Sequence, residues 1–208
     1  MKNLFLFLAL LILSCEKTGE NKPTPIKVPP ASISIVDEPK TANSGTAAAV
    51  GLEINQFKTR IVAKNYTEKQ AQKVFKAQEI IGKIFRSARF KQEVLSRKYT
   101  STKLSAEQIY KTLIDGDEKR SPGPDQEMDL QIQMYRANNS TVGWTKGSID
   151  LVHTNSKFYD KYSACRVASN ITHEWSHKLG FDHASAKDSK SVPYSLNDII
   201  ETLCPSYL

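Results

Sequence analysis

A group of histidines and one glutamate has the residue types and the spacing of a catalytic metal site. The stretch reads His-Glu-Trp-Ser-His-Lys-Leu-Gly-Phe-Asp-His over residues 173–183. His173 and His177 are four residues apart, so on a helix their rings project from one face and can bind the same ion. Glu174 lies beside that face, where its carboxylate can reach a water on the metal rather than the metal itself.

Gly180 and His183 complete this arrangement. Glycine adopts positive φ without steric cost, so Gly180 can end the helix and turn the chain back, which brings His183 within reach as a third ligand. Three protein ligands leave the fourth position open for water, as a catalytic zinc requires. We therefore predict one Zn²⁺ bound by His173, His177 and His183. The fourth histidine of the chain, His153, is interpreted as an ordinary residue at a strand end.

The spacing His-Glu-x-x-His-x-x-Gly-x-x-His resembles the zinc-binding motif of the metzincins, a clan of metallopeptidases that includes astacins, serralysins, matrix metalloproteases and adamalysins. The resemblance implies an α+β, zincin-like catalytic domain, with a mixed twisted sheet, two packed helices and an active-site zinc helix. It also implies hydrolysis of peptide bonds by a metal-activated water, with Glu174 as the general base. The predicted function is a zinc-dependent endopeptidase acting on a protein or peptide substrate.

Two other functions are compatible with the same residues. Another zinc hydrolase of the cell envelope, cutting peptidoglycan peptides or amides, would use the same metal and the same glutamate. A catalytically inactive zinc-binding surface lipoprotein would use the histidines alone. Glu174 argues against this last alternative, because a structural zinc site has no use for a general base.

The sequence departs from the metzincin pattern at two places. Metzincins carry a methionine in a turn beneath the zinc, whereas this chain has no methionine after Met134. Residues 191–194 take about that place, with Pro193 where the methionine would sit. Ala184 follows the third histidine and matches none of the named subfamilies, so no subfamily is assigned. Tyr194 is a candidate for stabilising an oxyanion, as tyrosines do in some relatives, and the alternative is that it only packs.

The predicted strands precede the zinc helix. Residues 128–135 alternate between apolar and polar side chains, which is typical of a half-buried strand. In metzincins an upstream strand pairs with the extended backbone of the substrate, and a segment around residue 143 resembles it; the alternative is an ordinary sheet strand. That segment consists of Val142, Gly143, Trp144 and Thr145. The strand candidates are residues 57–63, 128–135, 141–145 and 149–152.

Two helices are predicted from their starts. Thr67 and Ser105 are each followed three residues later by glutamine, the pattern of a capping box. The first pattern predicts a helix over about 67–86, and the second predicts a helix that stops at Gly116. The zinc helix carries an apolar stripe that we expect to pack against the sheet. The stripe consists of Ala168, Ile171, Trp175 and Leu179.

The N-terminus has the pattern of a targeting segment. An apolar run over residues 4–13 follows Lys2 and is too short to span a membrane, which is typical of a secretory signal. The end of this run resembles a bacterial lipobox and predicts lipidation of Cys15; the alternative is a plain cleaved signal. We expect an exported lipoprotein of the bacterial cell envelope, anchored to the membrane and facing the periplasm or the surface. The predicted divisions are 1–14 for the signal peptide, 15–48 for the lipidated cysteine and a disordered tether, and 49–208 for the metallopeptidase domain.

The remaining cysteines and the charge bear on stability and partners. Cys165 and Cys204 are a candidate disulfide in an exported chain, and the alternative is that they stay apart.

The net charge is +7, but lysines and arginines alternate with acidic residues along the chain. This pattern indicates a solvated surface and no nucleic-acid partner. We expect a monomer.

Overall fold

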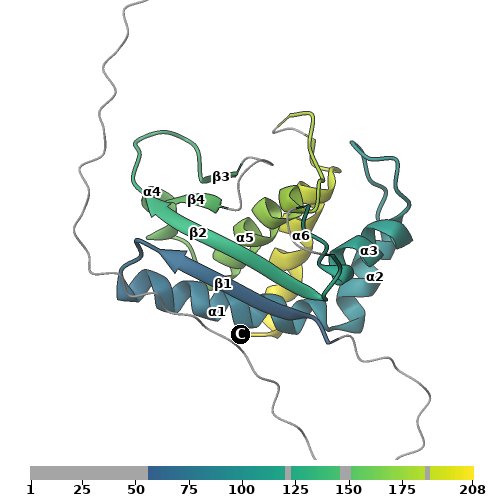
Figure 1. The fold of residues 1–208 in the computed structure, drawn as a ribbon, viewed down its shortest axis with the longest axis horizontal. Coiled ribbons are helices and arrows are strands. Elements are labelled where there is room, and N and C mark those ends of the chain that lie inside the picture. Colours follow the sequence, from purple (N-terminus) through teal and green to yellow (C-terminus); the bar gives the residue numbers. More distant parts are fainter. Residues whose placement is uncertain (1–55, 120–122, 146–150, 186–187) are drawn as a thin grey trace, which may run out of the picture.

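The computed structural model describes residues 56–119, 123–145, 151–185 and 188–208. Over these residues the chain is α+β, with a mixed four-stranded sheet and six helices (Figure 1). The predicted signal peptide, Cys15 and the tether lie outside the described residues, as do the first residues of the predicted domain and part of the strand expected at 149–152. No helix in the described ranges is long and apolar enough to cross a membrane.

The sheet has the order β1-β2-β4-β3. Strands β1 (Lys58–Lys64), β2 (Glu127–Tyr135) and β4 (Leu151–Asn155) are parallel, while β3 (Gly143–Thr145) is antiparallel to β4. Strand β3 therefore lies at one edge of the sheet, with a side that pairs with no strand among the described residues. The alternation predicted for β2 is confirmed. Its buried side chains are Met128, Leu130, Ile132 and Met134.

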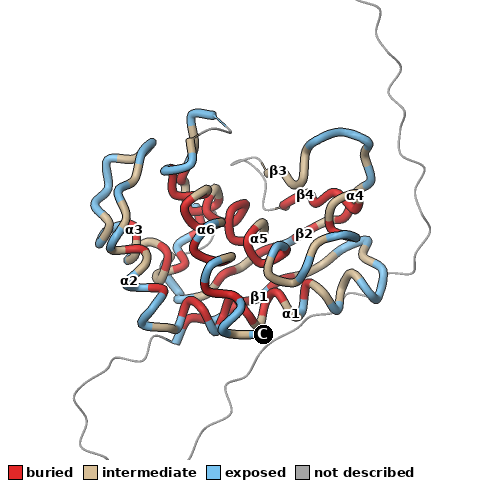
Figure 2. Tube along the Cα trace, turned by 180° about the vertical axis from the view of Figure 1, so that it is seen from behind, coloured by how far each residue is buried: buried red, intermediate tan, exposed pale blue. Residues whose placement is uncertain are grey.

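The helices gather on one side of the sheet. Helices α1 and α5 lie against the sheet, α6 packs against α5, and α2 and α3 lie together at one end (Figure 1). The buried residues are concentrated where α5, α6 and the sheet meet (Figure 2). The helices are α1 (Glu68–Phe85), α2 (Ala88–Ser96), α3 (Ala106–Asp115), α4 (Ser156–Tyr159), α5 (Ala164–Lys178) and α6 (Val192–Leu203), followed by a 3-10 turn at Cys204–Ser206.

Both predicted capping boxes are present. The Thr67 hydroxyl accepts from the Gln70 backbone N–H, and the Gln70 side chain accepts in return from the Thr67 N–H. Ser105 and Gln108 make the same pair of bonds at the start of α3. Gly116 ends α3 in the left-handed region with φ of 65°. Each cap satisfies backbone groups that the helix leaves open and contributes about 1 kcal/mol.

The expected fold class needs one correction. The α+β class and the mixed sheet are confirmed, but the six helices of the described residues exceed the two packed helices and one zinc helix that we expected. Helices α2, α4 and α6 were not predicted. Helix α6 has apolar residues at helical spacing and a proline in its first turn, a position where proline is favoured. Its buried apolar residues are Val192, Pro193, Leu196, Ile199, Ile200 and Leu203.

Trp175 anchors α5 in the core. Its side chain is fully buried, and its ring meets Phe57 and Phe85 edge-on, with centroids 5.9 and 5.7 Å away. The whole apolar stripe predicted on this helix is buried. Truncating a buried tryptophan to alanine costs about 3–5 kcal/mol, so this packing fixes the position of the helix that carries the histidines.

A buried carboxylate holds Trp175 in place. Glu118, in the loop after α3, accepts from the Trp175 indole N–H at 2.5 Å and from the Asp129 backbone N–H at 3.0 Å, both through Oε1. Its Oε2 is buried without a hydrogen bond to the described residues. Burial raises the pKa of Glu118 to about 7, and the bond from Trp175 opposes that shift. The site therefore favours the protonated carboxyl.

Neutralising Glu118 is expected to stabilise the protein at alkaline pH. Its folded-state pKa lies above the ordinary glutamate value of 4.5, so stability falls as the pH rises from about 4.5 through about 7 and then levels off. Glu118→Gln mimics the protonated form and should gain on the order of 1–2 kcal/mol at pH 8 after allowance for screening, with little change at pH 4.5. Urea unfolding at both pH values measures this. Asp117→Asn, at an exposed neighbour, is the control; equal stability of wild type and Glu118→Gln at pH 8 would contradict the assignment.

Candidate metal centre

The end of α5 is built to return the chain towards the helix. Gly180 has φ of 94°; its N–H donates to the His177 carbonyl, and the Phe181 N–H donates to the Ser176 carbonyl. This pair of hydrogen bonds forms a Schellman motif, which favours glycine at its left-handed position. A Cβ at residue 180 would also lie 2.3 Å from Cε of Lys119. The glycine predicted to turn the chain is thus required by its backbone conformation, whereas the end of the exposed Lys119 side chain could move aside.

The turn brings the three histidines together. Each of His173, His177 and His183 offers a ligand atom, and these atoms lie within 4.8 Å of one another. Their ring centroids are 5.1 to 5.4 Å apart. Zinc binds imidazole nitrogen at about 2.0–2.1 Å, so one ion reaches all three rings after small side-chain rotations. Among the described residues, this is the cluster that can hold a metal ion.

The protonation of the rings suits a metal. Nδ1 of His177 lies 2.7 Å from the Phe181 carbonyl oxygen, to which it can only donate, and this leaves Nε2 as the ligand atom. Burial lowers the pKa of His173 to about 3, helped by the two neighbouring histidines and opposed by the backbone of Pro193. Burial also lowers the pKa of His177. Neutral imidazoles are the form that binds metal ions.

Two ring nitrogens support the same interpretation. Nδ1 of His173 and Nδ1 of His183 are buried and make no hydrogen bond of normal geometry with the described residues. Buried polar atoms are nearly always paired, and exceptions gather where an ion or water completes the site. The residues present therefore fit a metal ion bound by three histidines.

Glu174 lies beside the cluster, at the edge strand. Its side chain is buried, and burial raises its pKa to about 7, while the charge of Lys178 lowers it. Gly143 of β3 lies close to this carboxylate. A Cβ at this residue would lie 3.1 Å from Oε1 of Glu174 and 3.1 Å from Oδ1 of Asn170. The missing side chain at Gly143 leaves space for the carboxylate.

Adding a side chain at Gly143 is therefore expected to disturb Glu174. Gly143→Ala needs a shift of a few tenths of an ångström, so we expect a mild loss of hydrolytic activity, whereas Gly143→Val should lower it by about tenfold or more, since small displacements of catalytic groups are costly. Bound zinc should be unchanged in both variants, because the atoms nearest to a Cβ at this position belong to Asn170, Glu174 and the backbone of His153. None of these residues is among the three candidate ligands. Activity with parallel metal analysis tests this; a fully active Gly143→Val would contradict the role of this space.

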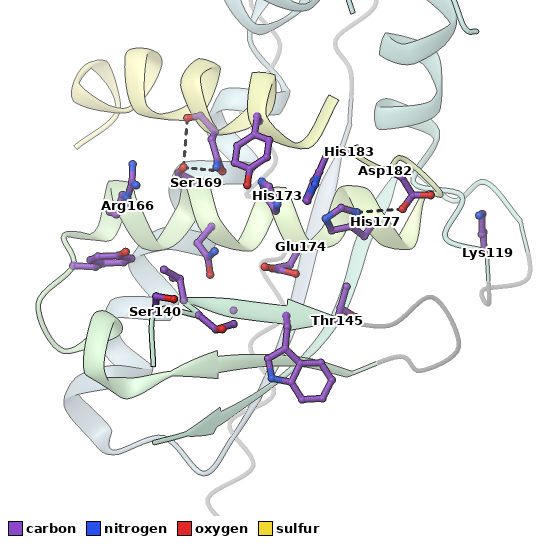
Figure 3. A pocket seen from close by; sticks show the side chains of 18 residues that line it. Lys119, Ser140, Thr145, Arg166, Ser169, His173, Glu174, His177, Asp182 and His183 are labelled. Atoms are coloured by element: carbon purple, nitrogen blue, oxygen red, sulfur yellow. Dashed lines mark hydrogen bonds and ion pairs between the residues drawn. The ribbon is translucent and has the colours of Figure 1, made fainter. Parts of the chain in front are cut away.

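The cluster opens into a cleft of about 850 Å³ between β3, α5 and the start of α6 (Figure 3). All four residues of the predicted substrate-binding segment, 142–145, line it, as do the three histidines and Glu174. Trp144 lines the cleft and also stacks on His153, with ring centroids 3.9 Å apart. The structure thus brings the predicted strand, Glu174 and the three histidines to one opening.

Pro193 and Tyr194 lie in the first turn of α6. The Tyr194 ring lies against two of the three histidines, with its centroid 4.8 Å from that of His173 and 4.9 Å from that of His183. Pro193 is buried beside it, and its backbone is close enough to influence the pKa of His173. The segment predicted to take the place of the methionine turn therefore lies against the histidine cluster.

Helix α6 is tied to α5 at its other end. Cys165 and Cys204 form a disulfide with an S–S distance of 2.08 Å, which joins the start of α5 to the residue after α6. Arg166 pairs with Glu201 next to it, and the Ser169 hydroxyl lies 2.9 Å from the same carboxylate. These bonds make one wall of the cleft from two helices that are distant in sequence.

Several residues of the cleft were not predicted. Arg166 and Asn170 precede Glu174 by eight and four residues, so their place on the same helix face was readable from the spacing. Lys119 comes from the loop after α3, and no pattern in the sequence placed it here. The other unpredicted residues lining the cleft are Ser140, Thr141, Tyr162, Ser169, Asp182 and Asn197.

Searches against models of protein families, curated proteins and solved structures gave no significant match to this chain. The metal centre is therefore assigned from the histidine motif and from the geometry that the fold gives it. Both indicate three histidines that can hold one metal ion, with a buried glutamate beside them.

Proposed function

We propose that the protein is a zinc-dependent endopeptidase of the metzincin type. The observation that carries the proposal is the convergence of three histidines and a buried glutamate at a cleft bordered by β3, whose outer edge pairs with no strand among the described residues. A structural zinc site has no use for a free carboxylate or for an open cleft. A catalytic site needs both.

Different residues of the chain carry out the steps of hydrolysis. His173, His177 and His183 would hold a zinc ion, which would supply the Lewis acidity to acidify a water molecule and to polarise the scissile carbonyl. The edge of β3 binds the extended substrate backbone by main-chain hydrogen bonds. Glu174 takes a proton from the attacking water as the oxygen adds to the carbonyl carbon. When the carbon–nitrogen bond breaks, Glu174 passes that proton to the leaving nitrogen. Tyr194 donates a hydrogen bond to the carbonyl oxygen as its negative charge grows.

The cellular setting belongs to the same proposal. A lipid on Cys15 and a tether over residues 15–48 would hold the domain at the surface of a membrane in the bacterial envelope, where protein or peptide substrates reach it. The disulfide supports an oxidising compartment, because such bonds rarely persist in the cytosol. We propose a monomer with no nucleic-acid partner.

One alternative draws support from the cleft itself. Its lining includes several polar side chains, such as those of Ser140, Thr141 and Asn170. Such side chains suit peptides rich in amide and carboxyl groups, such as those of peptidoglycan, and a hydrolase of these peptides or amides would use the same zinc and Glu174.

The proposal is tested by metal analysis and by digestion of a mixed peptide library and of peptidoglycan fragments with the full chain. We expect one zinc per chain and cleavage of internal peptide bonds, both abolished by a chelator and restored by zinc. Cleavage of peptidoglycan fragments alone would establish the alternative. Zinc without any hydrolysis would point to a binding lipoprotein, and absence of zinc would refute the metal centre.

A further inference from the structure

The cleft continues past Glu174 towards the beginning of α5, where it forms a polar recess that we call the α5 lobe. Arg166, Asn170 and Glu174 are spaced by four residues, so they follow one another along one face of the helix in steps of about 6 Å. Figure 3 shows Arg166 and Ser169 at the opposite end of the cleft from His177, Asp182 and Lys119. The α5 lobe is lined by Tyr162, Arg166, Ser169, Asn170 and Asn197.

Internal hydrogen bonds decide which groups the lobe offers to a ligand. The hydroxyl of Tyr159, which is buried, donates to Oδ1 of Asn170 at 2.9 Å. That bond fixes the amide so that its NH₂ group is the end left for a ligand. The Ser169 hydroxyl lies 3.0 Å from Oδ1 of Asn197 and 2.9 Å from Oε1 of Glu201, and its single proton can be donated to only one of them. The acceptor oxygen of Asn170 is thus used inside the protein.

Arg166 adds a charged donor. One nitrogen of its guanidinium pairs with Glu201, and its central carbon lies 5.6 Å from the centroid of the Tyr162 ring. A guanidinium has five N–H bonds in a fixed plane, so a single ion pair leaves further donors. Oε1 of Glu201 also lies within hydrogen-bonding distance of the Ser169 hydroxyl. Arg166 and the Asn170 amide therefore give the lobe donors for a ligand.

The proposed reaction determines which residue of the substrate lies at this end of the cleft. Glu174 hands its proton to the leaving nitrogen, so the residue that carries this nitrogen lies on the Glu174 side. The lobe begins one helical turn from Glu174, at Asn170. The side chain of the residue that follows the scissile bond therefore points into the lobe.

We propose that the α5 lobe binds a carboxylate side chain, so that the enzyme cleaves before aspartate or glutamate. The proposal rests on the proposed function for its orientation. Arg166 and the Asn170 amide donate to the carboxylate, and charge-assisted bonds of this kind are stronger than neutral ones. An apolar side chain would leave these donors without partners, which is costly in a closed site.

Zinc-binding peptide hydroxamates test the lobe without turnover. Three compounds carry glutamate, glutamine or leucine at the first position after the hydroxamate, and their affinity for the zinc-loaded full chain is measured by calorimetry. We expect the glutamate compound to bind about tenfold or more tightly than the leucine compound, and Arg166→Gln to remove most of that preference. Lys161→Gln, which removes an exposed charge nearby that does not line the cleft, should keep it.

The same compounds separate failure of this proposal from failure of the proposed function. Equal affinities in wild type, or a preference that survives Arg166→Gln, would overturn the lobe even if peptides are cleaved elsewhere. Discrimination by the hydroxamates without cleavage of the matched peptides would support the lobe and overturn the peptidase. Cleavage before glutamate in wild type and not in Arg166→Gln would support both.

Discussion

Glu174→Ala is expected to lower kcat/KM for peptide hydrolysis by about 10²–10⁴-fold, the contribution usual for a general base. Zinc should remain at one per chain, because the glutamate is not among the three ligands. The fold should persist as well, since removing a buried carboxylate relieves its desolvation. Initial rates on a peptide found by library digestion measure the effect, and metal analysis and a melting curve accompany them.

Glu174→Gln is the control that separates proton transfer from packing. Glutamine keeps the size of the side chain and its hydrogen-bonding capacity next to Gly143, but it cannot accept the proton of water. We expect it to be as inactive as the alanine variant. Appreciable activity in Glu174→Gln would assign the base elsewhere, and loss of zinc in either variant would show that the carboxylate supports the metal.

His177→Ala should abolish activity together with stoichiometric zinc binding. The loss of one of three ligands leaves an incomplete site, and His177 is the ligand whose orientation is fixed by its bond to the Phe181 carbonyl. The variant should still fold, because α5 is held in the core through Trp175 on a different face. Zinc content after gel filtration, with circular dichroism as the check on folding, measures this.

His153 provides a matched histidine control. It stacks on Trp144 outside the cluster, so His153→Ala removes an imidazole without removing a ligand. We expect one zinc per chain in this variant. Full zinc binding by His177→Ala, or loss of zinc from His153→Ala, would contradict the ligand assignment.

Features that depend on neighbours in sequence were predictable. The capping boxes at Thr67 and Ser105, the stop at Gly116 and the alternation in β2 each follow from a local rule that needs no tertiary information. The convergence of the three histidines was predictable for the same reason, since the helix period and one glycine turn generate it. These parts of the site lie within eleven consecutive residues.

Features that depend on contacts between residues distant in the sequence were not predictable. Glu118 meets Trp175 across 57 positions of the chain, and nothing around Glu118 distinguishes it from a surface carboxylate. The α5 lobe needs Asn197 from another helix, and that helix went unpredicted. Its proline was considered for the place of a missing methionine rather than as a first-turn residue. The pairing of Cys165 with Cys204 remained open until the positions of both helices were known.

The edge of β3 that pairs with no strand among the described residues also bears on self-association. An unpaired strand edge can hydrogen-bond any extended chain, including the strands of another copy, and long exposed edges promote aggregation. Strand β3 is three residues long and faces α5 across the cleft, so a second copy could reach it only by threading a single strand into that opening. An edge of this length inside a cleft is therefore a poor template for stacking sheets.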